Sequence, residues 1–213
     1  MYMSVKADTK RLTRYLTFQR KQIPFATSKA LNDVAFDCRS SIQKSLPKKL
    51  DRPTAGITRS VQVEKSKKKN LVAIVGFAGL GFKSTKWSES PAKIMRRHIE
   101  GGTRSAKNKP IHVPIVRNIK LNKFGNLPRT KIKTLLGKPD RYFSGKPKGR
   151  DAGVYERINK KNNRSLKMLV NYEKTTQYQS GRFPLRKIVE LTIRNKYHKR
   201  FEAALKYALR PKR

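Results

Sequence analysis

The stretch IPFATSKALNDVAFDCRSSIQKSL, residues 23–46, decides the fold class of this chain. Apolar residues recur in it at intervals of three and four, which is the spacing of one face of an α-helix. Pro24 occupies a first-turn position, where proline is tolerated, and Pro47 follows the last apolar residue of the series. The spacing therefore predicts a helix over 24–47 with an apolar stripe of Phe25, Ala30, Leu31, Val34, Cys38, Ile42 and Leu46.

Helices are also predicted on either side of this one. Upstream, Asp8 or Thr9 can cap a separate short helix that carries Leu12, Tyr15 and Leu16. Near the other end of the sequence, Pro184 begins a long helix, and ALRPKR follows it as a basic tail. The apolar stripe of that helix is predicted to be Leu185, Ile188, Val189, Tyr197, Phe201, Ala204, Leu205 and Ala208.

Between the long helices, short apolar and β-branched runs predict strands at 61–66, 70–77, 111–116, 141–143, 153–158 and 166–172. Pro114 suits an edge strand, because proline cannot donate to a sheet ladder. Short helices are predicted at 90–100, where Gly101 is the terminator, and between Asn126 and Gly137. We expect a single α+β domain over 1–213, with long helices near both termini packed on a central mixed or antiparallel sheet.

The charge of the chain is its most unusual property. Fifty-three Lys and Arg against thirteen Asp and Glu give a net charge of +40 over 213 residues. Self-repulsion at this level destabilises a compact state, so a polyanionic partner is expected to offset it. Forty positive charges could neutralise roughly 70 Å of duplex DNA, which favours nucleic acid over a small acidic ligand. No apolar run approaches the length of a membrane span, so no membrane partner is expected.

Four basic loop extensions are predicted around 64–70, 102–110, 144–151 and 159–165. A solvated surface explains any one of them, but the chain lacks the acids to compensate for all of them together. The absence of a recognisable helix-turn-helix, zinc finger or homeodomain favours backbone contacts without sequence preference. The candidate DNA-binding residues are Lys67, Lys68, Lys69, Arg104, Lys107, Lys109, Lys146, Lys148, Arg150, Lys160, Lys161 and Arg164.

Catalytic and metal-binding patterns do not emerge from the sequence. His98 and Glu100 are two residues apart on a short helix, so they point to different faces and do not form an acid–base pair. FAGLGF (77–82) lacks the spacing of a phosphate-binding loop, and no GxSxG, HExxH or CxxC is present. Cys38 is the lone cysteine, which excludes an internal disulfide and a cysteine-based zinc site. We therefore expect no enzymatic activity, no cofactor and no metal.

Several segments resemble one family of tailed-bacteriophage virion proteins, the minor tail protein Z or tail-completion proteins. The most specific are IPFATSKALN (23–32), IEGGTR (99–104) and KFGNLPR (123–129). LPKKLDRPT (46–54) and the last long helix add to the likeness, which covers most of the chain in order. The resemblance implies a component of the head–tail junction, neck or upper tail, in a ring around the DNA path, and it carries over no catalytic residue.

The two lines of argument together predict a non-enzymatic tail-completion or head–tail connector protein that binds the DNA backbone along the genome exit channel. It would assemble in the cytoplasm of the bacterial host and reside in the virion. Its partners would be genomic DNA, other connector, portal or tail proteins, and copies of itself in a ring, with a hexamer as one candidate. Three alternatives stay open: a nucleoid- or ribosomal-type nucleic-acid-binding protein, a phage nuclease, and basic loops that bind acidic protein surfaces instead of DNA.

Overall fold

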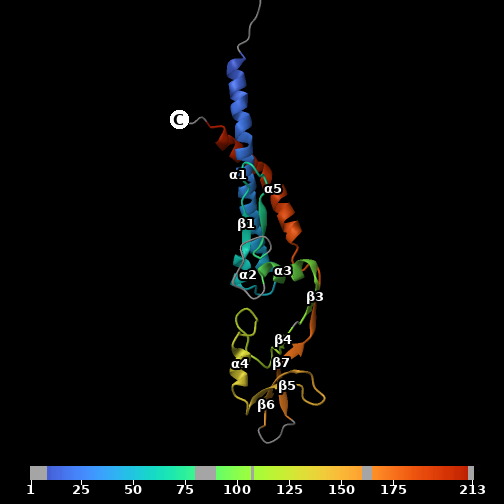
Figure 1. Ribbon diagram of the computed structural model, residues 1–213. Coiled ribbons are helices and arrows are strands. Elements are labelled where there is room, and N and C mark those ends of the chain that lie inside the picture. Colours follow the sequence, from blue (N-terminus) through green and yellow to red (C-terminus); the bar gives the residue numbers. More distant parts are fainter. Residues whose placement is uncertain (1–8, 80–89, 107, 160–164, 211–213) are drawn as a thin grey trace, which may run out of the picture. The chain divides into compact units, whose positions relative to one another are not determined.

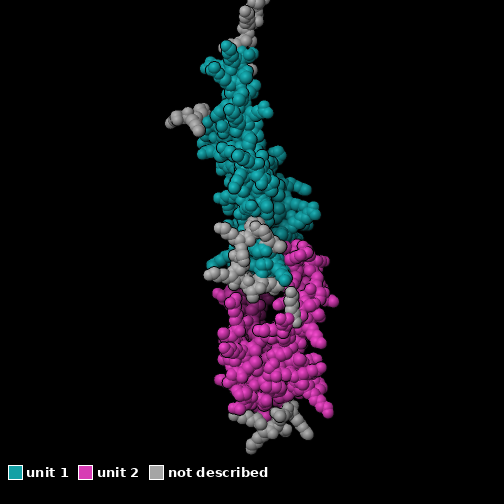
Figure 2. Space-filling model, viewed as in Figure 1, with its two compact units in different colours: residues 1–49, 55–95, 183–213 teal, residues 50–54, 96–182 magenta. Residues whose placement is uncertain are grey.

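The computed structural model describes residues 9–79, 90–106, 108–159 and 165–210. They fall into two compact units (Figure 2). Unit 1 comprises residues 1–49, 55–95 and 183–213, and unit 2 comprises residues 50–54 and 96–182. The α+β prediction is confirmed, with a long helix near each end of the chain and antiparallel sheets. Compactness does not by itself establish independent folding, so the single-domain prediction stays a prediction.

Unit 1 is built around a pair of antiparallel helices, α1 (Lys10–Lys49) and α5 (Leu185–Ala208) (Figure 1). Small residues form the seam between them: Ala26, Ala30 and Ala204 are buried there. Alanine lets two helix backbones approach closely, and the larger side chains of Phe201 and Leu205, together with Ala208, pack at the edges of the seam. The predicted stripes are confirmed, since each of their residues is buried or half-buried in the structure.

One continuous helix replaces the two that the sequence predicted over residues 9–47. Both Pro24 and Pro47 lie inside α1. Pro24 removes the donor that would bond the Arg20 carbonyl, but Arg20 is exposed, so water can take the place of that donor. Burial of Ala26 and Ala30 on the following turns favours continuation of the helix through the proline.

A hairpin of β1 (Val61–Glu64) and β2 (Ile74–Phe77) follows the short helix α2 (Ala55–Arg59) and packs against α1. Polar contacts attach its outer end to the helix. The Ser28 hydroxyl donates to the Ser66 carbonyl at 3.1 Å, and the Ser66 hydroxyl donates back to the Ser28 carbonyl at 3.0 Å. The Ser66 amide also donates to the Asn32 side chain at 2.7 Å. These bonds hold the chain against α1 just before its lysine-rich turn.

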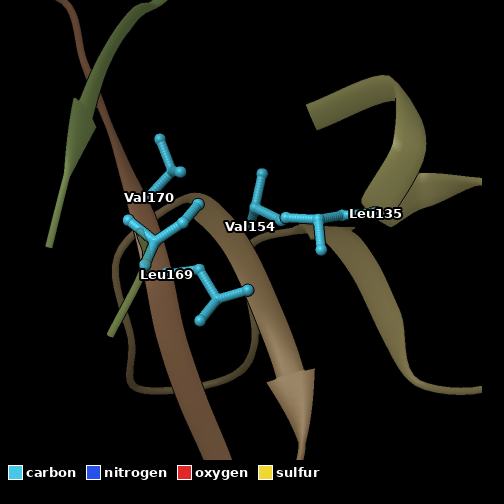
Figure 3. Close-up of a cluster of buried hydrophobic side chains, with 5 residues drawn as sticks. Leu135, Val154, Leu169 and Val170 are labelled. Atoms are coloured by element: carbon cyan, nitrogen blue, oxygen red, sulfur yellow. The ribbon is translucent and has the colours of Figure 1, made fainter. Parts of the chain in front are cut away.

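In the described part of unit 2, the strands form two antiparallel sheets where the sequence had suggested part of one central sheet. The larger has the order β4 (Ile111–Pro114), β7 (Leu166–Glu173), β6 (Gly153–Arg157), β5 (Tyr142–Gly145). β4 lies at an edge, as Pro114 predicted. Helix α4 (Lys131–Leu136) contributes Leu135 to a core with Val154, Leu169 and Val170 (Figure 3).

The sequence did not predict the second sheet, which pairs β3 (Gly102–Ser105) with β8 (Thr175–Tyr178). Residues 102–105 had been expected in a basic loop. β3 begins directly after α3 (Pro91–Glu100), a helix that the boundary between the units divides. Gly101 ends α3 with a φ of +79°, as predicted, and a Cβ there would come within 2.8 Å of the Ser180 amide nitrogen. Glycine therefore ends the helix and also leaves room for the backbone of residues 178–180, which passes close to it.

Asp37 joins α1 to α5 through ionic hydrogen bonds. Its carboxylate accepts from Lys196 at 3.0 Å and from two guanidinium nitrogens of Arg200 at 2.9 and 3.1 Å. The Asp37 side chain is only 14% exposed, so the pair is shielded from water on one side. The hydrogen bonds from Arg200, and then those from Lys196, lower the pKa of Asp37 below its ordinary value.

Replacing Asp37 with asparagine should lower the free energy of unfolding at pH 7 by about 1–2 kcal/mol, between the values typical of exposed and buried ion pairs. A lowered pKa in the folded state stabilises the protein above the ordinary carboxyl pKa of about 3.9. The wild-type advantage should therefore hold above about pH 5 and decline as pH falls through the folded pKa. Denaturant titrations over this pH range measure it. Asp51→Asn, which removes an exposed pair with Arg52, is the control and should have a far smaller effect; an equal effect would refute the role of Asp37.

Candidate nucleic-acid interface

The first predicted cluster forms the tight turn of the β1–β2 connection in unit 1. Lys67 and Asn70 exchange backbone hydrogen bonds of 2.8 and 3.0 Å, which leaves Lys68 and Lys69 as the two central residues of the turn. All three lysines are exposed. Because Ser66 is bonded to α1, the turn is held along the helix instead of projecting as a loose arm.

Aromatic rings of α1 support two lysines of this region. The Lys68 ammonium lies 5.1 Å from the centroid of the Phe25 ring, and the Lys65 ammonium lies 5.5 Å from that of Phe36. Such contacts orient a cation without neutralising it, because the ring carries no net charge. The turn therefore presents a fixed concentration of positive charge, which suits phosphate binding.

In unit 2, the loop between β5 and β6 contains Lys146, Lys148 and Arg150, all exposed. The end of the loop that precedes β6 is attached to the sheet. Arg150 donates to the Leu166 carbonyl at 2.8 Å, and the buried Tyr155 donates its hydroxyl to the Asp151 carbonyl at 2.6 Å. Lys146 and Lys148 are the residues of this cluster best placed to reach an external anion.

The remaining candidates are dispersed or lie outside the described residues. Arg104 is in strand β3, opposite Thr176, and not in the loop that the sequence predicted. Lys109 is exposed between β3 and β4. Lys107, Lys160, Lys161 and Arg164 lie outside the described residues. The structure thus groups three candidates on one turn of unit 1 and three on one loop of unit 2.

The structure adds a basic depression that sequence reasoning missed. It has a volume of about 460 Å³ and is lined by Arg141, Glu156, Arg157, Ile158 and Lys167. Strand pairing brings these residues together: Glu156 lies opposite Lys167, and the Arg157 amide donates to the Arg141 carbonyl. The charged residues come from three separate segments of the sequence, and the strand register that joins them is a tertiary property.

Two arginines of the depression are held by the protein itself. Arg141 bonds Glu156 at 2.6 Å. Arg157 donates to the Pro139 carbonyl at 2.7 Å, and its guanidinium lies 4.4 Å from the centroid of the Phe143 ring, which stacks on Tyr155. With Lys167, the lining carries three cations and one carboxylate. This arrangement can accept a phosphate group with little loss of side-chain freedom.

The His98–Glu100 pair has no catalytic geometry. Glu100 bonds Arg96 at 2.6 Å, whereas His98 packs edge-on against the Tyr178 ring at 5.4 Å. Burial, and then the nearby Arg182 and Arg97, lower the pKa of His98 below its ordinary value, so the imidazole is neutral at pH 7. Among the residues that the structure describes, no three His, Cys, Asp or Glu side chains gather as metal ligands would.

We predict that Arg157→Lys lowers the free energy of unfolding by about 1 kcal/mol although the net charge is unchanged. Lysine cannot both donate to the Pro139 carbonyl and stack on Phe143 as the planar guanidinium does. Denaturant unfolding followed by tyrosine fluorescence or circular dichroism measures the difference. Lys167→Arg in the same depression is the matched control and should be close to neutral. Equal stability of the Arg157→Lys protein and the wild type would show that Arg157 is not held as described.

Comparisons of the chain with protein-family models, with curated proteins and with solved structures find no match. The helices of the described residues include none with both the length and the apolar character that a bilayer span requires. What the interface does must therefore be argued from its own charges, contacts and positions.

Proposed function

We propose that this chain is a non-enzymatic virion structural protein of a tailed phage, a tail-completion or head–tail connector component that contacts the DNA backbone along the genome exit channel. The observation that carries the proposal is the excess of basic residues. If each of the thirteen acids neutralised one base, forty bases would still lack an acidic partner within the chain. A polyanion threaded through the assembly offsets that repulsion.

The positions of the described cations support backbone contact. The Lys67–Lys69 turn and the Lys146–Arg150 loop connect strands, and neither presents a helix of the kind that enters a major groove. Contacts to phosphates position a duplex without reading its sequence. They are individually weak and salt-sensitive, so packaged DNA can be held at the channel and still slide out.

A ring of copies would strengthen these contacts. Each copy would add its own turn, loop and basic depression, and repeated weak sites around one channel act together on a single polymer. The resemblance of IPFATSKALN, IEGGTR and KFGNLPR to tail-completion proteins supports a place in the neck or upper tail, with assembly in the host cytoplasm. Apolar surface on the long helices is available for contacts with other virion proteins.

We expect the purified chain to bind unrelated duplex DNA sequences with equal affinity and with a steep dependence on salt. Replacing Lys67, Lys68 and Lys69 together with glutamine should reduce the slope of log K against log salt by about 3, because each phosphate contact contributes about 0.9. Fluorescence anisotropy over a salt series measures the slope. The triple variant of Lys146, Lys148 and Arg150 tests the loop of unit 2 in the same way.

The matched control removes three exposed cations from α5 in unit 1, by Arg194→Gln, Lys199→Gln and Lys206→Gln. It lowers the net charge equally, and its slope should change by less than about 1. If the control reduces the slope as much as the turn variant does, binding reflects net charge alone and the specific interface is refuted.

The virion location has its own test. Particles purified on a density gradient after nuclease treatment should contain a stoichiometric band at the 24.6 kDa mass of the chain. The nuclease step removes protein that is bound only to released DNA. Absence of the band, in an infection in which the chain is expressed, would favour a nucleic-acid-binding protein that acts outside the particle.

A further inference from the structure

The N-terminal part of α1 extends beyond the helix that covers the rest of it. The last turn of α5 meets α1 near Phe25, whose ring centroid lies 6.3 Å from that of Tyr207, and Ala208 packs against the cluster of Ala26 and Ala30 (Figure 1). Residues 10–24 precede this point. At 1.5 Å per residue they span about 22 Å of helix that α5 does not reach.

The apolar seam of the helix pair continues into this uncovered part. Leu16, Gln19 and Ile23 precede Ala26 and Ala30 at intervals of three, four, three and four, which place all five on one helix face. Ala26 and Ala30 are 0% exposed, whereas Leu16 is 53% and Ile23 is 49% exposed. The stripe that α5 covers in one half of α1 is thus open to solvent in the other half.

The charge around the open seam indicates what can cover it. Residues 10–25 contain five basic residues and no acidic one: Lys10, Arg11, Arg14, Arg20 and Lys21. Each helix in the described residues carries more basic than acidic side chains, so a helix from a second copy would bring like charge against this segment. Like charges at a helix interface oppose association, and opposite charges beside the seam favour it.

From this continuity and this charge we infer that the seam of α1 at Leu16, Gln19 and Ile23 is a docking site for an amphipathic helix of another protein, with acidic residues beside its apolar stripe. The partner helix would pack along the N-terminal part of α1, in the way that α5 packs along the residues after Phe25. This interaction goes beyond the proposed DNA contact and does not depend on it, because the residues involved belong to neither basic cluster.

The seam suits a helix better than a lipid surface. A helix that lies in a membrane interface presents a wide apolar face, whereas a narrow line at three- and four-residue spacing is typical of helix–helix packing. Gln19 stands in the middle of the line, where it would be costly in acyl chains but can pair within a helix interface. Phe18 points away from the line by its position on the helix, so the apolar residues of this segment do not form one broad face.

The test uses the full chain and a synthetic acidic peptide of about three heptads, with leucine at its two seam positions and glutamate beside them. A peptide of the same composition with a scrambled order is the probe control. We expect the ordered peptide to bind more tightly than the scrambled one, at low and at high salt. The double variant Leu16→Gln with Ile23→Gln should weaken binding of the ordered peptide about tenfold or more.

The matched variant is Phe18→Gln, which removes an exposed apolar side chain of the same segment from outside the seam. It should change peptide affinity less than about twofold. Circular dichroism of each variant checks that α1 stays helical. Neither variant should alter the salt dependence of DNA binding, so failure of the docking proposal and failure of the DNA proposal give different results.

Four results would overturn the inference. The scrambled peptide could bind as tightly as the ordered one, or the seam double variant could leave binding unchanged. Vesicles of anionic phospholipid could bind the wild-type chain through Leu16 and Ile23 while the peptide does not, which would make the segment a lipid-binding helix. Sedimentation equilibrium could show a dimer that the double variant abolishes, which would assign the seam to a second copy of this chain.

Discussion

The contact of Asp37 with Arg200 and Lys196 is the interaction on which unit 1 depends. It joins two long helices that are both rich in positive charge and that would otherwise repel each other. The alanine seam beside it supplies close packing, and the ion pair adds a directional contact at one point along the two helices. One carboxylate between two cations helps to fix the register of the two helices, while the bonds of Ser66 to Ser28 and Asn32 place the hairpin and its lysine turn on α1.

The small number of acidic residues, thirteen against fifty-three basic ones, also determines where ion pairs form in the rest of the molecule. In the described residues, carboxylates are used within or between elements: Asp33 with Lys29 on α1, Glu190 with Arg186 on α5, and Glu156 with Arg141 between strands. Structural pairing thus uses up acidic residues and leaves most bases uncompensated on turns, loops and outer helix faces.

Sequence reasoning succeeded where a pattern is local and failed where pairing is distant. The stripes of both long helices, the edge position of Pro114 and the helix stop at Gly101 follow from spacing and backbone preference, and the structure has them. Strands β3 and β8 were missed because GTRS and TTQY carry no hydrophobic alternation and are ordered by each other. Arg157 was missed as a site residue for the same reason, since its partners come from other strands.

The amino-acid sequence by itself determined the α+β class, the faces of the helices and the excess of forty positive charges, because periodicity and charge are properties of the chain. Tertiary structure alone decided that α1 runs through Pro24, that Lys68 rests on Phe25, and that Arg141, Arg157 and Lys167 share one depression. It also decided which half of the α1 seam α5 covers. These outcomes depend on energies of packing between segments distant in the chain, and such energies are not encoded in any single stretch of residues.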